Sequence, residues 1–157
     1  MLEANRRYAE RFDGGALPAR PVRALVVLTC MDARLDPLPA LGLALGDAHV
    51  VRNAGGRASE DAIRSLIVST HLLGTREVVV IHHTGCGLEG VTDEELRTRV
   101  REATGADTSG LAFLPFEDLE GSVREDVRRI RESPFLPPDV VVSGFVQDVR
   151  TGSLRRV

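Results

Sequence analysis

The sequence predicts an α/β fold with a mainly parallel central sheet of four strands, a short antiparallel strand at the C-terminus, and helices that flank the sheet. Two observations predict it. Apolar-rich runs such as residues 23–29 and 77–82 are typical of strands that are buried on both faces, as in parallel sheets. Segments with apolar residues at helical spacing separate these runs, and a strand–helix–strand order implies parallel strands joined by right-handed crossovers.

The N-terminal segment differs from the rest of the chain. Residues 3–12 have the pattern of a short amphipathic helix, which ends at Gly14 and Gly15. An isolated helix of this length is marginal in water, so we expect it to pack on the rest of the molecule or on a partner subunit. We therefore predict that residues 1–157 form one domain, with residues 1–15 as an N-terminal arm that packs on a partner subunit.

The later helices carry start and stop signals. Ser59 is a suitable N-cap for the first long helix, and Thr92 with Glu95 forms a capping box at the start of the next. Pro134 and the prolines after it prevent the last helix from continuing. After the arm, the expected elements are strands at 23–29 and 49–53, a helix at 59–73, a strand at 77–82, helices at about 92–103 and 117–132, a strand at 139–146 and an antiparallel return at 153–157.

Composition excludes several classes of function. Of the 157 residues, 43% are hydrophobic and 27% charged, which is ordinary for a globular domain. A net charge of −3 gives no overall basic character for binding nucleic acid. All 20 basic residues are arginine, which excludes lysine chemistry such as a Schiff base or a P-loop. We find no signal-peptide pattern and no run of membrane-spanning length, so we expect a cytoplasmic protein without a membrane partner, in which thiols stay reduced.

The only two cysteines, Cys30 and Cys86, each lie in a short polar cluster that follows an apolar strand. Because the carboxyl ends of parallel strands meet at one edge of a sheet, we expect the two clusters to converge. The turn at 83–86 presents His83 to the same point, whereas His82 faces the opposite side as a hydrogen-bonded interior or interface histidine. Two thiolates and an imidazole suit Zn²⁺, and three protein ligands leave a fourth position for water or substrate. The pattern therefore predicts a catalytic rather than a structural zinc site.

Asp32 and Arg34 accompany Cys30 and are close enough in sequence to pair. Beside a metal ion, an ionised carboxylate accepts the proton of zinc-bound hydroxide and orients its lone pair towards an electrophile. Arg34 keeps Asp32 ionised and holds it away from the metal. If that pairing broke, Asp32 would become the fourth ligand and shut the site. We therefore expect Asp32 and Arg34 to be the catalytic pair.

Three motifs carry a resemblance to a known family. They are Cys-Met-Asp-Ala-Arg at 30–34, Arg-Asn-Ala-Gly-Gly at 52–56 and His-Thr-Gly-Cys-Gly at 83–87. In this order and spacing they resemble the β-class carbonic anhydrases, most of all the short prokaryotic members. With the ending at 144–154, the resemblance covers nearly the whole chain. It implies the β-carbonic anhydrase fold and a carbonate dehydratase, a zinc lyase that reversibly hydrates CO₂ to bicarbonate and a proton by zinc-bound hydroxide.

The resemblance also implies residue roles and an assembly. One Zn²⁺ per subunit would be bound by Cys30, His83 and Cys86, with Asp32 and Arg34 as the catalytic dyad. Family members are dimers or multiples of dimers with the active site at the subunit boundary, so a homodimer or a dimer of dimers is expected. Some members gate the site with a bicarbonate pocket that includes a tryptophan, and this chain has no tryptophan. We therefore predict that Asp32 stays hydrogen-bonded to Arg34, rather than binding zinc, at neutral pH.

Other functions stay open on the sequence alone. Hydrolases of carbon disulfide or carbonyl sulfide resemble the same fold and zinc site, and differ in access tunnel and assembly rather than in ligands. A non-catalytic zinc-binding module would have no structural need of Asp32 and Arg34 beside the ion. A redox protein that joins Cys30 to Cys86 is disfavoured because the chain has no Cys-x-x-Cys motif.

Overall fold

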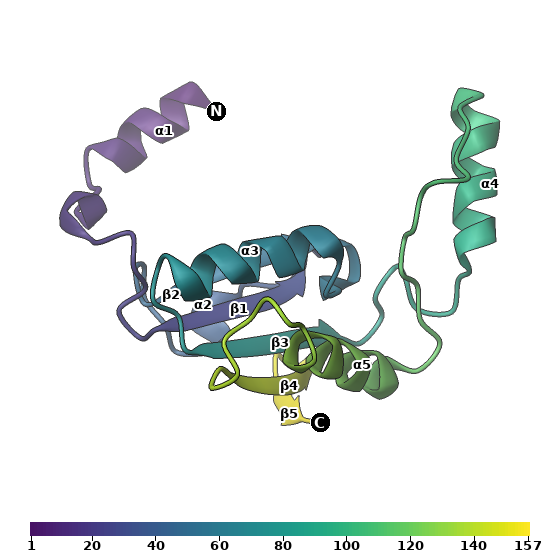
Figure 1. The fold of residues 1–157 in the computed structure, drawn as a ribbon. Helices are drawn as coiled ribbons and strands as arrows, with labels where there is room; N and C mark the ends of the chain where they lie inside the picture. Colours follow the sequence, from purple (N-terminus) through teal and green to yellow (C-terminus); the bar gives the residue numbers. More distant parts are fainter.

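A five-stranded sheet forms the centre of the molecule in the computed structural model, which describes residues 1–157 (Figure 1). The strand order is β2-β1-β3-β4-β5. The first four of these strands are parallel, and β5 runs antiparallel to β4. The fold class predicted from the sequence is thereby confirmed. The strands are β1 (Leu25–Cys30), β2 (Ala48–Asn53), β3 (Glu77–His83), β4 (Val141–Gln147) and β5 (Leu154–Arg156).

Five helices connect or flank the strands, and their predicted caps are present. The Ser59 hydroxyl accepts a hydrogen bond from the Ala62 N–H, and Thr92 with Glu95 forms the full capping box. Helix α2 was not expected from the sequence, because its four residues, Pro37–Ala40, are too few to show a helical period. The helices are α1 (Leu2–Ala9), α2 (Pro37–Ala40), α3 (Glu60–His71), α4 (Asp93–Thr104) and α5 (Leu119–Arg131), with short 3-10 turns at Gly14–Ala16 and Ala54–Gly56.

The main core lies on one face of the sheet, where α3 and α5 cover it. On the opposite face Val27, Val79 and Ile81 form a smaller cluster, on which Leu41 packs from the end of α2. Burial on both faces explains why the strands read as continuous apolar runs. The main cluster consists of alternate strand residues, the facing residues of α3 and α5, and two residues from the adjoining loops, namely Val26, Leu28, Val78, Val80 and Val142, then Ala62, Leu66 and Ile130, and finally Ala58 and Leu136.

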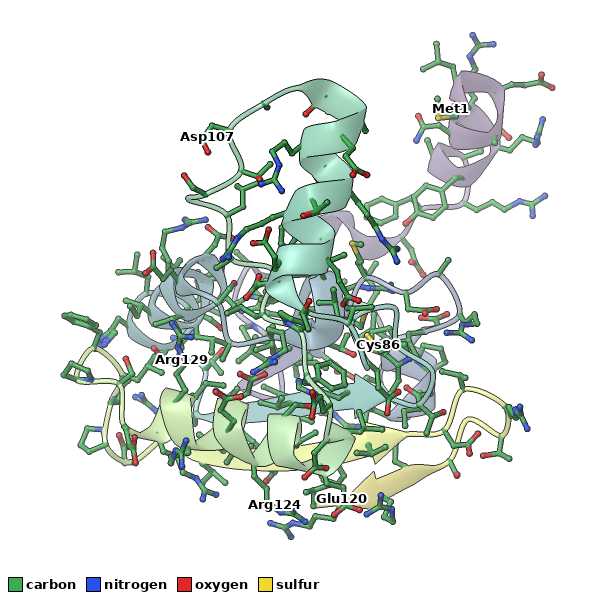
Figure 2. All side chains as sticks on the ribbon, turned by 90° about the vertical axis from the view of Figure 1, so that its right-hand side faces the viewer. Met1, Cys86, Asp107, Glu120, Arg124 and Arg129 are labelled. Atoms are coloured by element: carbon green, nitrogen blue, oxygen red, sulfur yellow. The ribbon has the colours of Figure 1, made fainter.

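Two segments stand away from the sheet. In both Figure 1 and Figure 2, α1 and α4 project from the same side of the molecule. No residue of α1 or α4 is buried. The N-terminal helix therefore does not pack on the rest of its own chain. None of the helices has the length and apolar character that a membrane crossing requires.

Candidate metal centre

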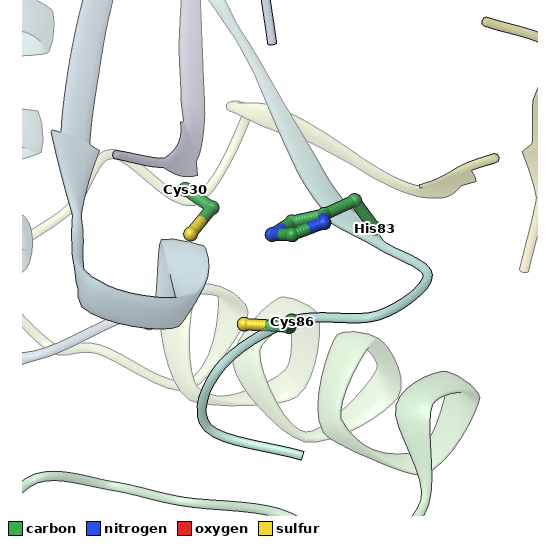
Figure 3. A group of neighbouring side chains, drawn as sticks. All are labelled: Cys30, His83 and Cys86. Carbon is green, nitrogen blue, oxygen red and sulfur yellow. The ribbon is translucent and has the colours of Figure 1, made fainter. Parts of the chain in front are cut away.

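Two neighbouring strands bring three candidate metal ligands together. Cys30 is the last residue of β1, His83 is the last residue of β3, and Cys86 follows in the next turn. All three are buried, and their ligand atoms lie within 4.8 Å of one another. Figure 3 shows the two sulfurs and the imidazole pointing towards a common point. The convergence expected from the parallel sheet is present at this edge.

The orientation of His83 is set by the turn that follows β3. Its Nδ1 lies 3.0 Å from the Thr84 carbonyl oxygen, which only accepts, so Nδ1 carries the proton. Nε2 then carries the lone pair, and this buried atom has no hydrogen-bond partner. An unpaired imidazole nitrogen beside two thiols fits a zinc ion, which takes these three donor types. His82 faces the other way and contacts Ser122 of α5 through Nδ1 at 2.7 Å, as expected of an interior histidine.

The three groups shift one another's pKa values. The interaction between the Cys86 and Cys30 sulfurs lowers the pKa of Cys30 and raises the pKa of Cys86. Burial alone would lower the pKa of His83, but its interactions with Cys30, the Thr84 carbonyl and Asp32 together outweigh burial and raise the pKa. Metal binding would release the thiol protons, because zinc binds cysteine as a thiolate and histidine as a neutral imidazole.

Asp32 and Arg34 form the pair predicted from the sequence. Arg34 donates from Nε to Oδ1 of Asp32 at 2.9 Å and from a terminal nitrogen to Oδ2 at 2.7 Å, and its backbone N–H also donates to Oδ1. These hydrogen bonds hold the pKa of Asp32 well below its usual range. Those from the Arg34 side chain have the largest effect, and the one from the Arg34 backbone comes next. Arg34 also donates to the Gly85 carbonyl at 3.0 Å, which joins this loop to the turn that carries Cys86. Asp32 Oδ2 lies 3.8 Å from His83 Nε2, so the carboxylate borders the metal centre.

Arg52 supports the same loop, a role that sequence reasoning missed. Its Nε donates to the Cys30 carbonyl at 3.0 Å, and a terminal nitrogen donates to the Asp32 carbonyl at 2.7 Å. The guanidinium thereby fixes the backbone on either side of Met31. The only signal in the sequence was the position of Arg52 at the start of the motif at 52–56.

Comparisons with known proteins agree with this geometry. Residues 25–154 match the family described as carbonic anhydrase. β-Carbonic anhydrase 1 of Mycobacterium tuberculosis is 41% identical over 158 residues, which cover 99% of this chain and 94% of that protein. The crystal structure of carbonic anhydrase from Streptococcus mutans aligns with a TM-score of 0.95 at 46% identity, covering 99% of this chain and 94% of that one. A carbon disulfide hydrolase of Acidithiobacillus thiooxidans is 34% identical, over 98% of this chain and 85% of that protein. These matches and the Cys–His–Cys centre show that the chain belongs to the β-carbonic anhydrase family.

Proposed function

We propose that this protein catalyses the reversible hydration of CO₂ to bicarbonate and a proton, with one zinc ion held by Cys30, His83 and Cys86. The observation that carries the proposal is the buried set of two sulfurs and an unpaired imidazole nitrogen. Three protein ligands are typical of catalytic zinc, because a fourth position is left for water or substrate. Asp32 borders that centre but is held by Arg34, so it does not complete a closed, structural set.

The side chains of the dyad give the reaction its geometry. When bound, zinc supplies a nucleophile from water near neutral pH. Asp32 stays ionised because Arg34 binds both of its oxygens, and Oδ2 faces the metal centre as a hydrogen-bond acceptor. An acceptor at that place holds the proton of the nucleophile, so that its lone pair is directed at the carbon of CO₂. Arg34 thus orients the Asp32 carboxylate, and Asp32 accepts the hydrogen bond from the nucleophile.

Carbon disulfide hydrolysis is the second candidate, favoured by the 34% identical relative that matches nearly the whole chain. Both CO₂ and carbon disulfide are linear molecules with an electrophilic carbon. The 41% identity to a β-carbonic anhydrase supports CO₂ as the substrate. We therefore propose CO₂ for this chain.

Stopped-flow measurement of CO₂ hydration tests this proposal. The zinc-loaded protein should hydrate CO₂ far above the buffer rate, lose the activity on chelation, and regain it with one zinc per subunit. Release of hydrogen sulfide from carbon disulfide, without CO₂ hydration, would instead establish the second candidate.

We also propose that residues 1–157 are one domain that works as a homodimer or a dimer of dimers, with residues 1–15 packed on the partner. In support, the apolar side chains of Leu2, Tyr8 and Phe12 are 74%, 58% and 46% exposed. α1 and α4 project from the same side of the molecule, so both could contact a second copy of the chain placed there (Figures 1 and 2). Apolar surface on such an arm is stabilised when a partner covers it.

A cytoplasmic location is part of the proposal. Cys30 and Cys86 are both free thiols, and zinc binds them as thiolates. A reducing compartment keeps them available, whereas an oxidising one favours disulfides. Fractionation of cells that express the protein would test the location.

A further inference from the structure

A cluster of buried charges lies next to the metal centre, and the proposed reaction does not use it. Arg57 is only 5% exposed and Asp126 only 1%. The Arg57 Nε donates to Asp126 Oδ2 at 2.8 Å, and a terminal nitrogen donates to Glu125 at 2.7 Å and to Asp126 Oδ1 at 3.4 Å. Burying an arginine is costly unless it is paired and hydrogen-bonded, so loss of either partner would leave an uncompensated buried charge.

Asp126 joins this arginine to His82. Its Oδ2 lies 3.1 Å from His82 Nε2, an electrostatic contact without good hydrogen-bond alignment. The other ring nitrogen, Nδ1, lies 2.7 Å from the Ser122 hydroxyl of α5. Burial alone would raise the pKa of Asp126, but its contacts with His82 and Arg57 outweigh burial and hold the pKa below its usual range. The ionised Asp126 carboxylate therefore contacts both Arg57 and His82, which come from different segments of the chain.

Both of these side chains contact one aromatic ring. The His82 ring stacks on Phe116 with centroids 5.8 Å apart, and the Arg57 guanidinium lies 5.7 Å from the centroid of the same ring. Arg57 also donates to the Leu114 carbonyl at 2.8 Å, two residues before Phe116. Leu114 has a left-handed backbone with φ of 58°, a strained conformation that persists where surrounding bonds hold it.

Phe116 in turn packs against the metal centre. It is 8% exposed and shares a buried cluster with Cys30 and Cys86. Its N–H donates to the Leu88 carbonyl at 3.1 Å, and its carbonyl accepts from the Gly90 N–H at 2.9 Å. Phe116 lies in an irregular segment between α4 and α5, so no helix or strand of its own fixes it. Its position depends on the contacts described above.

We propose that Arg57 and Asp126 form a clamp that positions Phe116, and through Phe116 holds the segment after Cys86 against the metal centre. The clamp residues are positioning residues, because neither lies among the candidate ligands. Held in this way, the aromatic ring keeps water from the sulfurs and limits the movement of the Cys86 turn. Groups behind the ligands commonly tune a metal site in this manner. The proposal rests on the zinc site of the proposed function.

Zinc retention tests the clamp with a readout that does not depend on activity. Arg57→Met removes the charge and its hydrogen bonds but keeps an apolar side chain of similar reach. The matched control is Arg124→Met on α5, where the arginine is 58% exposed and pairs only with Glu120 (Figure 2). We expect Arg57→Met to release zinc to a chelator about 10- to 100-fold faster than wild type. The absorption bands of its cobalt-substituted form should also shift, while the control matches wild type in both measurements.

A second variant separates the clamp from a merely structural role. Phe116→Leu should also release zinc faster, and adding Arg57→Met to it should cause little further change, because both changes act through the same ring. Independent, additive effects would overturn the proposal. If Arg57→Met does not fold, Arg57→Lys makes the same test, because one amine cannot replace all the bonds of the guanidinium. A folded Arg57 variant with wild-type zinc release and cobalt spectrum would also overturn it.

The outcomes distinguish the clamp from the zinc site itself. Wild-type protein that binds neither zinc nor cobalt would overturn the proposed function. Wild-type protein that holds zinc, with Arg57 variants that hold it equally well, would overturn only the clamp.

Discussion

Gly56 is the residue at which a single methyl group should do most damage to the metal centre. It follows β2 with a left-handed φ of 69°. A Cβ atom there would lie 2.9 Å from the Cys30 nitrogen and from the Thr29 carbonyl carbon, and 3.2 Å from the Ile81 carbonyl oxygen. These are backbone atoms of β1 and β3, the strands that carry Cys30 and His83, and they cannot rotate away. Gly56→Ala should therefore push apart the two strands that bring the ligands together.

The size of the effect follows from two contributions. A left-handed conformation costs a residue with a Cβ about 1–2 kcal/mol. Forcing extra volume into a packed interior costs about 1–3 kcal/mol more. Together, Gly56→Ala should lower the free energy of unfolding by about 2–5 kcal/mol. Gly42 is the matched control, because its φ is 65° and no atom lies within 4 Å of the added carbon. Gly42→Ala should therefore cost only the conformational part, about 1–2 kcal/mol.

Urea unfolding measures both variants, provided that protein and zinc concentrations are equal, because assembly and metal binding change the apparent stability. The difference between the two variants isolates the contact with the strands. Equal losses in Gly56→Ala and Gly42→Ala would refute the reasoning, since the backbone clash would then cost nothing.

Four further predictions concern the site, the buried charges and the arm. Asp32→Asn should keep zinc but lower CO₂ hydration by about 10²- to 10⁴-fold in stopped-flow assays, because the amide donates where an acceptor is needed; near-normal turnover would remove Asp32 from the mechanism. Cys86→Ala should lose zinc in metal analysis and melt at a lower temperature, and one retained zinc per subunit would contradict its role as a ligand. The pKa of Asp126 in the folded protein lies below its ordinary 3.8, so its contribution to stability is complete above that value and disappears as the pH falls through the folded pKa. The stability lost in Asp126→Asn should thus be large at neutral pH and shrink in acid, and unfolding curves with a pH-independent difference would count against this account. Deletion of residues 1–15 should yield monomers in analytical ultracentrifugation, whereas intact dimers would show that the arm is not needed for assembly.

Local patterns in the sequence predicted most of the secondary structure. β1 and β3 were recognisable because they are buried on both faces and therefore almost continuously apolar. The caps at Ser59 and Thr92 were recognisable because they bond to the backbone within their own first turn. α2 had no such signal, since a four-residue helix with two prolines shows no period. The arm helix ends at Ala9 rather than near residue 12, where fraying at a chain end makes limits hard to predict.

The metal centre was predictable because it follows from topology, whereas the clamp was not. Parallel neighbouring strands must bring their carboxyl ends to one edge, which places Cys30 beside His83. Arg57, by contrast, follows a glycine turn and resembles an exposed loop residue in the sequence. Its partner Asp126 lies 69 positions away, and Phe116 lies in a segment without regular structure. Only the folded chain brings these side chains together.

A crystal structure of the zinc-loaded protein at about pH 7–8 tests the central claim most directly. It should contain one zinc per subunit, with the sulfurs of Cys30 and Cys86 at about 2.3 Å and Nε2 of His83 at about 2.0–2.1 Å. A non-protein ligand should occupy the fourth position, while both oxygens of Asp32 remain on Arg34. An Asp32 oxygen within about 2.2 Å of the metal, or zinc bound elsewhere, would contradict an open site of this composition.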